Sequence, residues 1–176
     1  MATTPQNSSK EMMKNKNVAG GQLAMHSKAP PTGFFRDGYC RTGPEDKDNH
    51  SVAATVNHEF LDFTNSRGNN LREAGVKDGM KWCLCARRWK EAFDAAQKGQ
   101  ISPSAVPRVH LHASHESALN TVKYGDLSKY AMSGEAPKES TRNRQGAHSD
   151  PEQPSHRIAR EATELSGKVE PERVGG

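Results

Sequence analysis

The chain has 176 residues, of which 32% are hydrophobic and 26% are charged, and its mean hydropathy is −0.92. This length suits one domain of roughly 100 to 150 residues with extensions, and the hydrophilic composition excludes a core that involves the whole chain. No stretch approaches the ~20 apolar residues that a membrane span needs. We therefore expect one folded domain and no membrane partner.

Apolar residues are concentrated in the middle of the chain, so three regions are expected. Residues 1–16 are a flexible basic arm, residues 17–132 are the folded domain, and residues 133–176 are a low-complexity tail of mixed charge. The tail has seven basic and eight acidic residues and no run of lysine or arginine. Nucleic-acid-binding tails normally carry such runs, so nucleic acid is not the expected partner.

The cysteines and the N-terminal residues bear on the compartment. An odd number of cysteines argues against a secreted disulfide scaffold, and Cys83 and Cys85 are too close in the sequence to pair comfortably. The first residues contain no apolar segment of signal-peptide type. We therefore expect a cytoplasmic protein that is not secreted.

The first half of the domain predicts irregular chain followed by short elements. Residues 18–31 are expected to be extended, and residues 32–46, TGFFRDGYCRTGPED, predict a loop rich in turn residues. The run SVAATV at 51–56 predicts a short buried strand. Asn57 can then cap a helix that ends near Gly68.

The second half contains the strongest periodicity. Residues 78–99 predict one helix, with Asp78 as its N-cap and Gly99 as its terminator. Residues 108–113, RVHLHA, alternate as in a half-buried strand, which would place His110 and His112 on its outer face. A last helical turn is expected near YGDLSKYAM. The expected inner face of the long helix is Trp82, Cys85, Ala86, Trp89, Phe93 and Ala96. Together these elements predict a small α+β domain of short strands packed against two to four helices, flanked by extended tails.

The loop at residues 32–46 combines glycine, charge and cysteine, and it is open to two interpretations. Its charged groups, Arg36, Asp37, Glu45 and Asp46, could form an acid and base set or a cation site. Alternatively, the two aspartates accept from turn amides, Arg36 bridges a carboxylate, and Gly33, Gly38 and Gly43 adopt positive φ. We favour the structural interpretation. The residues expected to have structural roles are Phe34, Phe35, Arg36, Asp37, Gly38, Trp82, Trp89 and Phe93.

Thiol and imidazole groups are the candidates for chemistry. A metal site needs four soft or borderline ligands, and the candidates are His26, Cys40, Cys83, Cys85 and His115. A thiol nucleophile needs a nearby base, which His115 or His50 could supply to Cys40. Buried structural thiols explain the cysteines more simply, because free cysteine behaves as a small hydrophobe. No cofactor is expected.

Four segments carry a family resemblance: TGFFRDGYCRTGPED, HEFLDFTNSRGNNL, DGMKWCLCARRWKEAFDA and HASHESAL. In order and spacing they resemble the uncharacterised, mainly bacterial family known as domain of unknown function 2237, over about residues 17–131. The resemblance implies a fold but no reaction. It also implies that His26, Tyr39 and Ala53 stand where many members have cysteine, and that the segment from Leu71 to Asp78 is shortened.

Three functions are compatible with these observations. We expect a non-catalytic structural protein of a large cytosolic assembly, docking through the domain while its tails become ordered on protein partners such as tubulin. An axonemal doublet microtubule of a cilium would be one such assembly. The first alternative is a thiol- or metal-dependent enzyme or redox module using Cys40, Cys83 and Cys85. The second is a ribosome- or RNA-associated protein using the basic arm.

Overall fold

The computed structural model describes residues 15–135. The expectations for the basic arm and the tail lie almost entirely outside these residues. Within them the fold is α+β, as the sequence predicts, and no helix is long and apolar enough to cross a membrane. The elements in chain order are β1 (Val52–Thr55), α2 (His58–Ser66), β2 (Lys81–Leu84), α3 (Ala86–Gln97), η1 (Pro103–Ala105), β3 (Arg108–Val109), η2 (Leu111–Ala113), η3 (Glu116–Asn120) and α4 (Tyr124–Lys129), where η marks a 3-10 helix.

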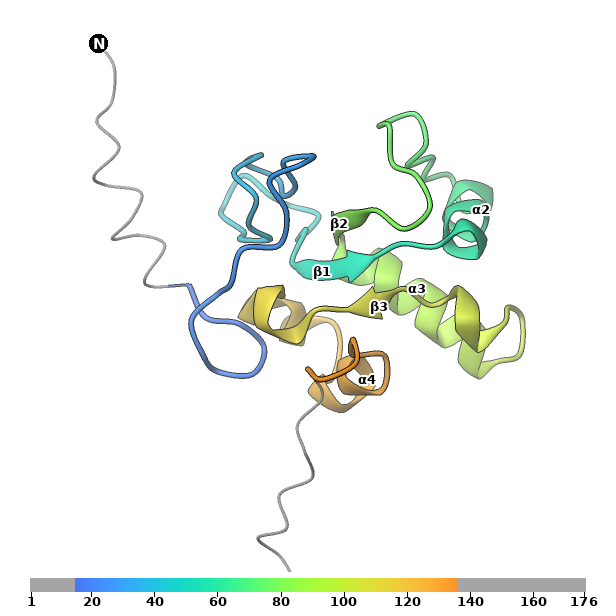
Figure 1. The fold of residues 1–176 in the computed structure, drawn as a ribbon. Helices are drawn as coiled ribbons and strands as arrows, with labels where there is room; N and C mark the ends of the chain where they lie inside the picture. Colours follow the sequence, from blue (N-terminus) through green and yellow to red (C-terminus); the bar gives the residue numbers. More distant parts are fainter. Residues whose placement is uncertain (1–14, 136–176) are drawn as a thin grey trace, which may run out of the picture. The chain divides into compact units, whose positions relative to one another are not determined.

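The three strands form one antiparallel sheet in the order β2, β1, β3, with β1 in the centre (Figure 1). Val52 lies opposite Leu84 of β2, and Ala54 lies opposite Val109 of β3. Val52, Ala53 and Ala54 are fully buried. A short, apolar strand suits this position because both of its faces are covered by protein. The predicted strand at 51–56 is thereby confirmed.

The helix that follows β1 begins and ends close to where the sequence predicts. Asn57 is its N-cap, and the side-chain Oδ1 accepts from the backbone N–H of Phe60 at 2.8 Å. Phe60 and Leu61 are buried on its inner face. The helix ends at Ser66, and Gly68 then turns the chain with a positive φ of 78°.

The single helix predicted over residues 78–99 is wrong in its first part. Residues 81–84 form β2 because their backbone groups pair with β1, and α3 begins only at Ala86. Cys85 is the N-cap of α3. Asp78 caps no part of this helix, since its Oδ1 accepts from the backbone N–H of His58 at 2.9 Å. The four residues KWCL are too few to distinguish the helical period from the strand period, and only the pairing with β1 decides between them.

The apolar face of α3 contributes most of the aromatic core. Trp89 is fully buried and stacks on Phe93 at 5.5 Å, and both rings meet Tyr130 edge-on. The indole N–H of Trp89 donates to the carbonyl of Pro107 at 3.1 Å. The predicted core roles of Trp89 and Phe93 are confirmed. Trp82 lies on β2 instead and is only partly buried.

The strand predicted at 108–113 stops after Val109. The N–H of His110 still bonds to the carbonyl of Ala53, but the N–H of Ala113 then bonds back to His110 and closes a turn. His110 and His112 therefore do not share a strand face. His112 is exposed, whereas His110 is partly buried and lies 2.9 Å from the hydroxyl of Thr55.

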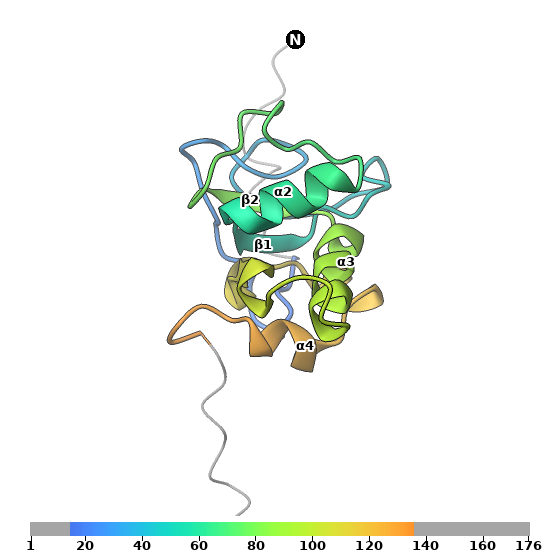
Figure 2. The same cartoon turned by 90° about the vertical axis from the view of Figure 1, so that its right-hand side faces the viewer.

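The long segment before β1 is irregular, as predicted, and isolated β-bridges join it to the residues that follow β3. Asn17 and Cys40 form isolated bridges with His115 and Ser114, respectively. Figures 1 and 2 show α2 beside β2 at one end of the fold and α4 at the other end. The loop over residues 32–46 lies next to β2, since the Cα atoms of Cys40 and Cys83 are 5.3 Å apart.

Candidate functional site

A disulfide ties the loop at residues 32–46 to β2. Cys40 and Cys83 are bonded with their Cα atoms 5.3 Å apart, although 43 positions separate them in the sequence. Both side chains are buried, but the expectation of free structural thiols is wrong for this pair. The bond also removes Cys40 as a nucleophile and both residues as metal ligands. Sequence reasoning missed the pairing because it placed Cys83 on a helix and not on the strand that adjoins the loop.

The remaining members of the expected metal set do not gather. His115 caps η3 by accepting from the N–H of Ser117 at 3.1 Å. His26 donates from Nε2 to the carbonyl of Ala54 at 3.1 Å and packs against His110. In residues 15–135 no three His, Cys, Asp or Glu side chains are placed to hold a metal ion.

The structural roles expected in the loop are partly realised. Gly33 and Gly38 adopt positive φ, whereas Gly43 does not. Asp37 accepts from the N–H of Tyr39 at 3.1 Å, as a turn aspartate should. Phe35 is partly buried under the guanidinium of Arg41.

Two further side chains of the loop differ from expectation. Phe34 does not anchor the core, because it is 42% exposed. Arg36 bridges no carboxylate among the described residues, and its guanidinium lies 4.8 Å from the ring centre of Trp82.

Three titratable side chains instead form a chain at the end of the loop. The carboxylate of Asp46 is buried and lies 2.6 Å from Nδ1 of His50. The same carboxylate accepts from the backbone N–H of His50 at 2.8 Å. The thiol of Cys85 is the group that raises the pKa of this imidazole most, which places it near the ring. Because Nδ1 faces Asp46, Nε2 is the ring nitrogen available to Cys85. We call Asp46, His50 and Cys85 the Cys85 site.

The imidazole of His50 is strongly perturbed. The hydrogen bond with Cys85 is the largest cause, and together with the bond and the charge of Asp46 it outweighs burial and raises the pKa of His50 from 6.5 to about 9. His50 is therefore a cation at neutral pH. A positively charged group beside a cysteine is a general feature of nucleophilic cysteines. Cys85 is partly exposed, so an electrophile can reach it.

The backbone positions this site with unusual conformations. Among the described residues, only Arg36 and Asn49 combine a side chain with positive φ, at 54° each. Asn49 precedes His50, and its carbonyl accepts from the N–H of Ala86 at 3.0 Å. That bond holds the loop against the first residue of α3, beside Cys85. Non-glycine residues adopt this conformation at an energetic cost, and they are often found at functional sites.

A cavity of about 340 Å³ adjoins His50. Its wall includes Cys83, which belongs to the disulfide, and aromatic, aliphatic and cationic side chains. We call it the aromatic cavity, and its principal lining residues are Phe34, Arg36, His50, Leu71, Trp82 and Cys83. The cavity meets the general size of small-molecule sites.

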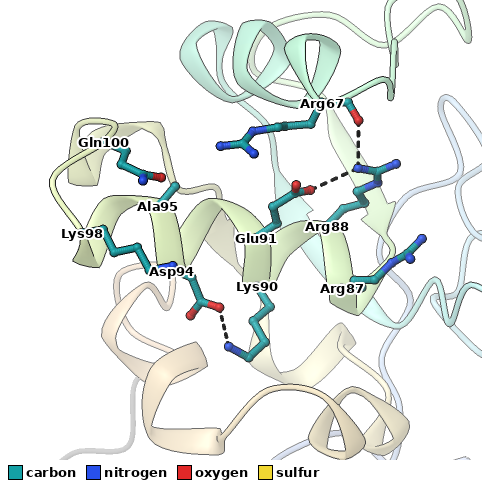
Figure 3. Close-up of a pocket in the computed structure, with 9 residues that line it drawn as sticks. All are labelled: Arg67, Arg87, Arg88, Lys90, Glu91, Asp94, Ala95, Lys98 and Gln100. Carbon is teal, nitrogen blue, oxygen red and sulfur yellow. Dashed lines mark hydrogen bonds and ion pairs between the residues drawn. The ribbon is translucent and has the colours of Figure 1, made fainter.

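A second hollow, of about 500 Å³, lies on the outer face of α3 (Figure 3). It is rich in lysine and arginine, but Arg88 pairs with Glu91 at 3.1 Å and Lys90 pairs with Asp94 at 2.6 Å. Such pairs three and four residues apart are typical of a solvated helix face. The hollow is therefore part of the polar face of α3, and no cysteine, serine or histidine is among the residues that line it.

Sequence reasoning found the members of the Cys85 site but not their association. His50 was considered as a base for Cys40, whereas its partner is Cys85. Asp46 was considered as a turn aspartate, which it also is. The spacing of Asp46 and His50 by four residues was the available signal, but outside a helix this spacing does not imply contact.

Comparison with known proteins gives a family without a reaction. Residues 16–131 match the model of a family described as "Uncharacterized protein conserved in bacteria (DUF2237)". Among curated proteins, none is similar enough to the chain to count as a match. The matched residues include the whole Cys85 site and the aromatic cavity.

Proposed function

Since the chain belongs to the DUF2237 family, whose description names no activity, we propose from the geometry that it is a thiol-dependent enzyme with Cys85 as nucleophile. The observation that carries this proposal is the buried carboxylate of Asp46 at 2.6 Å from the ring of His50, together with Cys85 as the group that raises the pKa of that ring most. A thiol, a base and a group that orients the base are the three parts of an activated cysteine.

The chemistry that this arrangement supports best is acyl transfer. The thiolate of Cys85, with its proton held on His50, attacks a carbonyl carbon, and the bond from that carbon to the leaving group breaks. His50 gives its proton to the leaving group, which departs neutral. Water then attacks the thioester, and His50 takes the proton from that water, so Cys85 is released and an acid is formed. Asp46 keeps the ring orientation throughout and stabilises the imidazole in the steps in which it is cationic.

The burial pattern supports separate roles for the three groups. Asp46 has a fully buried side chain, which suits an orienting residue that never meets solvent. His50 is 29% exposed, and Cys85 is partly exposed. The two residues that must exchange protons and bonds with a substrate are therefore the accessible ones.

Alkylation and acylation rates test the proposal. We expect iodoacetamide to modify Cys85 at pH 7 faster than it modifies N-acetylcysteine, with the site identified by mass spectrometry. The substitution His50→Gln should lower that rate roughly tenfold, because it removes the cation beside the sulfur. With p-nitrophenyl acetate we expect a burst of about one equivalent of nitrophenolate in the wild type and none in Cys85→Ser.

His58→Gln is a matched control. His58 also pairs with an aspartate four residues away, Asp62, at 3.2 Å, but on the exposed surface of α2. The substitution His58→Gln should leave the rate of alkylation and the rate of acylation unchanged. Equal alkylation rates in the wild type and His50→Gln would overturn the proposal, and so would a wild-type rate no higher than that of N-acetylcysteine.

The assembly hypothesis from the sequence remains a prediction. It holds that the domain docks on protein partners such as tubulin in a cytoplasmic or ciliary structure. The family description refers to bacteria, so it offers no support for a cilium. We place it second to the thiol function, because the described residues contain a specific arrangement for the latter.

A further inference from the structure

The charged groups of the aromatic cavity are of one sign. Arg36 and His50 line it, and no aspartate or glutamate is among the residues that the structure places in its wall. The charge of His50 is compensated by the buried carboxylate of Asp46 at 2.6 Å, so Arg36 is the cationic group of the wall that has no carboxylate partner among the described residues. Arg36 therefore favours a negatively charged ligand.

Arg36 is positioned to receive such a ligand. Its guanidinium carbon lies over the ring of Trp82, 4.8 Å from the ring centre, and the described residues place no carboxylate within ion-pair distance of it. Stacking uses the face of a guanidinium and leaves its N–H groups free to bind a carboxylate in the plane. The left-handed backbone of Arg36, with φ at 54°, directs the side chain at a conformational cost.

The remaining wall is flat and apolar. Phe34 is 42% exposed and stacks on His50 at 6.0 Å, and Trp82 and Leu71 are only partly buried. The apolar surface of an exposed phenylalanine is in contact with water, and a ligand that covers it removes this surface from water at a gain in free energy. Aromatic rings at the wall suit a flat apolar group of the ligand.

We propose that the aromatic cavity binds a small carboxylate with a flat apolar group, its carboxylate on Arg36 and its apolar group between Phe34 and Trp82. This inference rests on the proposed function of Cys85. Cys85 does not itself line the cavity, and His50, which lines it, is the residue that connects the cavity with Cys85. The substrate would be an acyl compound that carries a second, anionic group for Arg36. A volume of about 340 Å³ limits it to a small molecule.

Two alkylating reagents that differ in charge test the role of Arg36. Iodoacetate and iodoacetamide share the same leaving group, so the ratio of their rates at Cys85 reports the preference for an anion. We expect this ratio to be higher in the protein than in N-acetylcysteine. Arg36→Gln should lower the ratio roughly tenfold, the worth of one charge-assisted hydrogen bond. Arg36→Lys should retain most of the preference.

Arg108→Gln serves as the matched control, because Arg108 is exposed on β3 and lies outside the cavity. It should leave the ratio unchanged, which excludes a general effect of net charge. Thermal melting of each variant establishes that it is folded before its ratio is compared.

Protection from alkylation tests the apolar part of the inference. Phenylacetate should slow the reaction of Cys85 with iodoacetamide at lower concentration than acetate or phenylacetamide, since only phenylacetate has both groups. Equal protection by all three would overturn the inference, as would an Arg36→Gln ratio equal to that of the wild type. Loss of the His50 dependence would instead overturn the proposed function, so the two failures are distinguishable.

Discussion

The carboxylate of Asp46 contacts His50 twice, through Oδ1 to the ring Nδ1 at 2.6 Å and through Oδ2 to the backbone N–H at 2.8 Å. One contact fixes the imidazole and the other fixes the peptide that carries it. The buried carboxylate thus fixes the position of the imidazole and, after Cys85, contributes to its raised pKa.

Asp46→Asn should reduce the reactivity of Cys85. The bond with Cys85 is the largest cause of the raised pKa of His50 and remains in this variant, but an amide carries no charge to stabilise the imidazolium, so the pKa of His50 should fall below about 9. Titration of the His50 ring protons by NMR measures this shift, and the iodoacetamide rate at pH 7 should fall with it. Asp37→Asn, in the same loop, is the control. An unshifted His50 titration in Asp46→Asn would contradict the assigned role.

Stability should change with pH on the alkaline side. The pKa of His50 is raised above its unfolded value, mainly by the bond with Cys85, so its stabilising contribution is complete below about pH 6.5. That contribution is lost as the pH rises through 9. The difference in unfolding free energy between the wild type and His50→Gln should therefore shrink from pH 6 to pH 10 in urea denaturation. A constant difference would contradict this linkage.

Stability should also fall on the acid side, through His26. Burial lowers the pKa of His26 from 6.5 to about 4, so between these values the unfolded chain binds more protons than the folded one. Stability therefore decreases as the pH falls from 6.5 to 4. Replacing His26 with Gln should flatten the dependence of the melting temperature on pH in this range. His112→Gln, at an exposed position, should leave the dependence as it is.

Reduction of the disulfide should destabilise the domain. Closing a loop between residues 43 positions apart restricts the unfolded chain, and such a bond typically contributes about 3 kcal/mol. Adding a phosphine reductant should lower the urea midpoint of the wild type and of Cys85→Ser alike. The double variant Cys40→Ala, Cys83→Ala should show a low midpoint in both conditions. If reductant lowered its midpoint further, the bond would not explain the effect.

Gly33→Ala should disrupt the loop that carries Arg36. Gly33 has φ at +91°, and an added Cβ would lie 2.0 Å from the carbonyl oxygen of Tyr39. We expect a loss of more than about 2 kcal/mol in unfolding free energy. Gly68→Ala separates the effect of the positive φ from the effect of the clash, because the φ of Gly68 is also positive but an added Cβ meets no atom within 4 Å. It should cost about 1 kcal/mol.

Local sequence patterns were sufficient to predict the elements whose conformation depends on residues close together in the sequence. Asn57 and the apolar residues behind it specify α2, and the spacing of Trp89 and Phe93 specifies the inner face of α3. Both depend on contacts within a few residues. The start of α3 could not be obtained in this way, because β2 owes its conformation to pairing with β1.

The candidate site depends on contacts that no local pattern encodes. His50 reaches Cys85 because Asn49 adopts a left-handed conformation and its carbonyl bonds to Ala86. Cys40 reaches Cys83 because the loop folds back on β2. Neither relationship follows from residue type. The reactive residues could therefore be identified from the sequence, but the residues that they contact could not.

The link between Cys40 and Cys83 also determines what proteolysis would release. A single backbone cut anywhere between these two residues opens a ring and leaves one covalently joined molecule. That interval contains Asp46, His50, β1 and α2. A protein nicked there would migrate as the intact chain on a denaturing gel without reductant, and would separate into two fragments only after the sulfur bond is reduced.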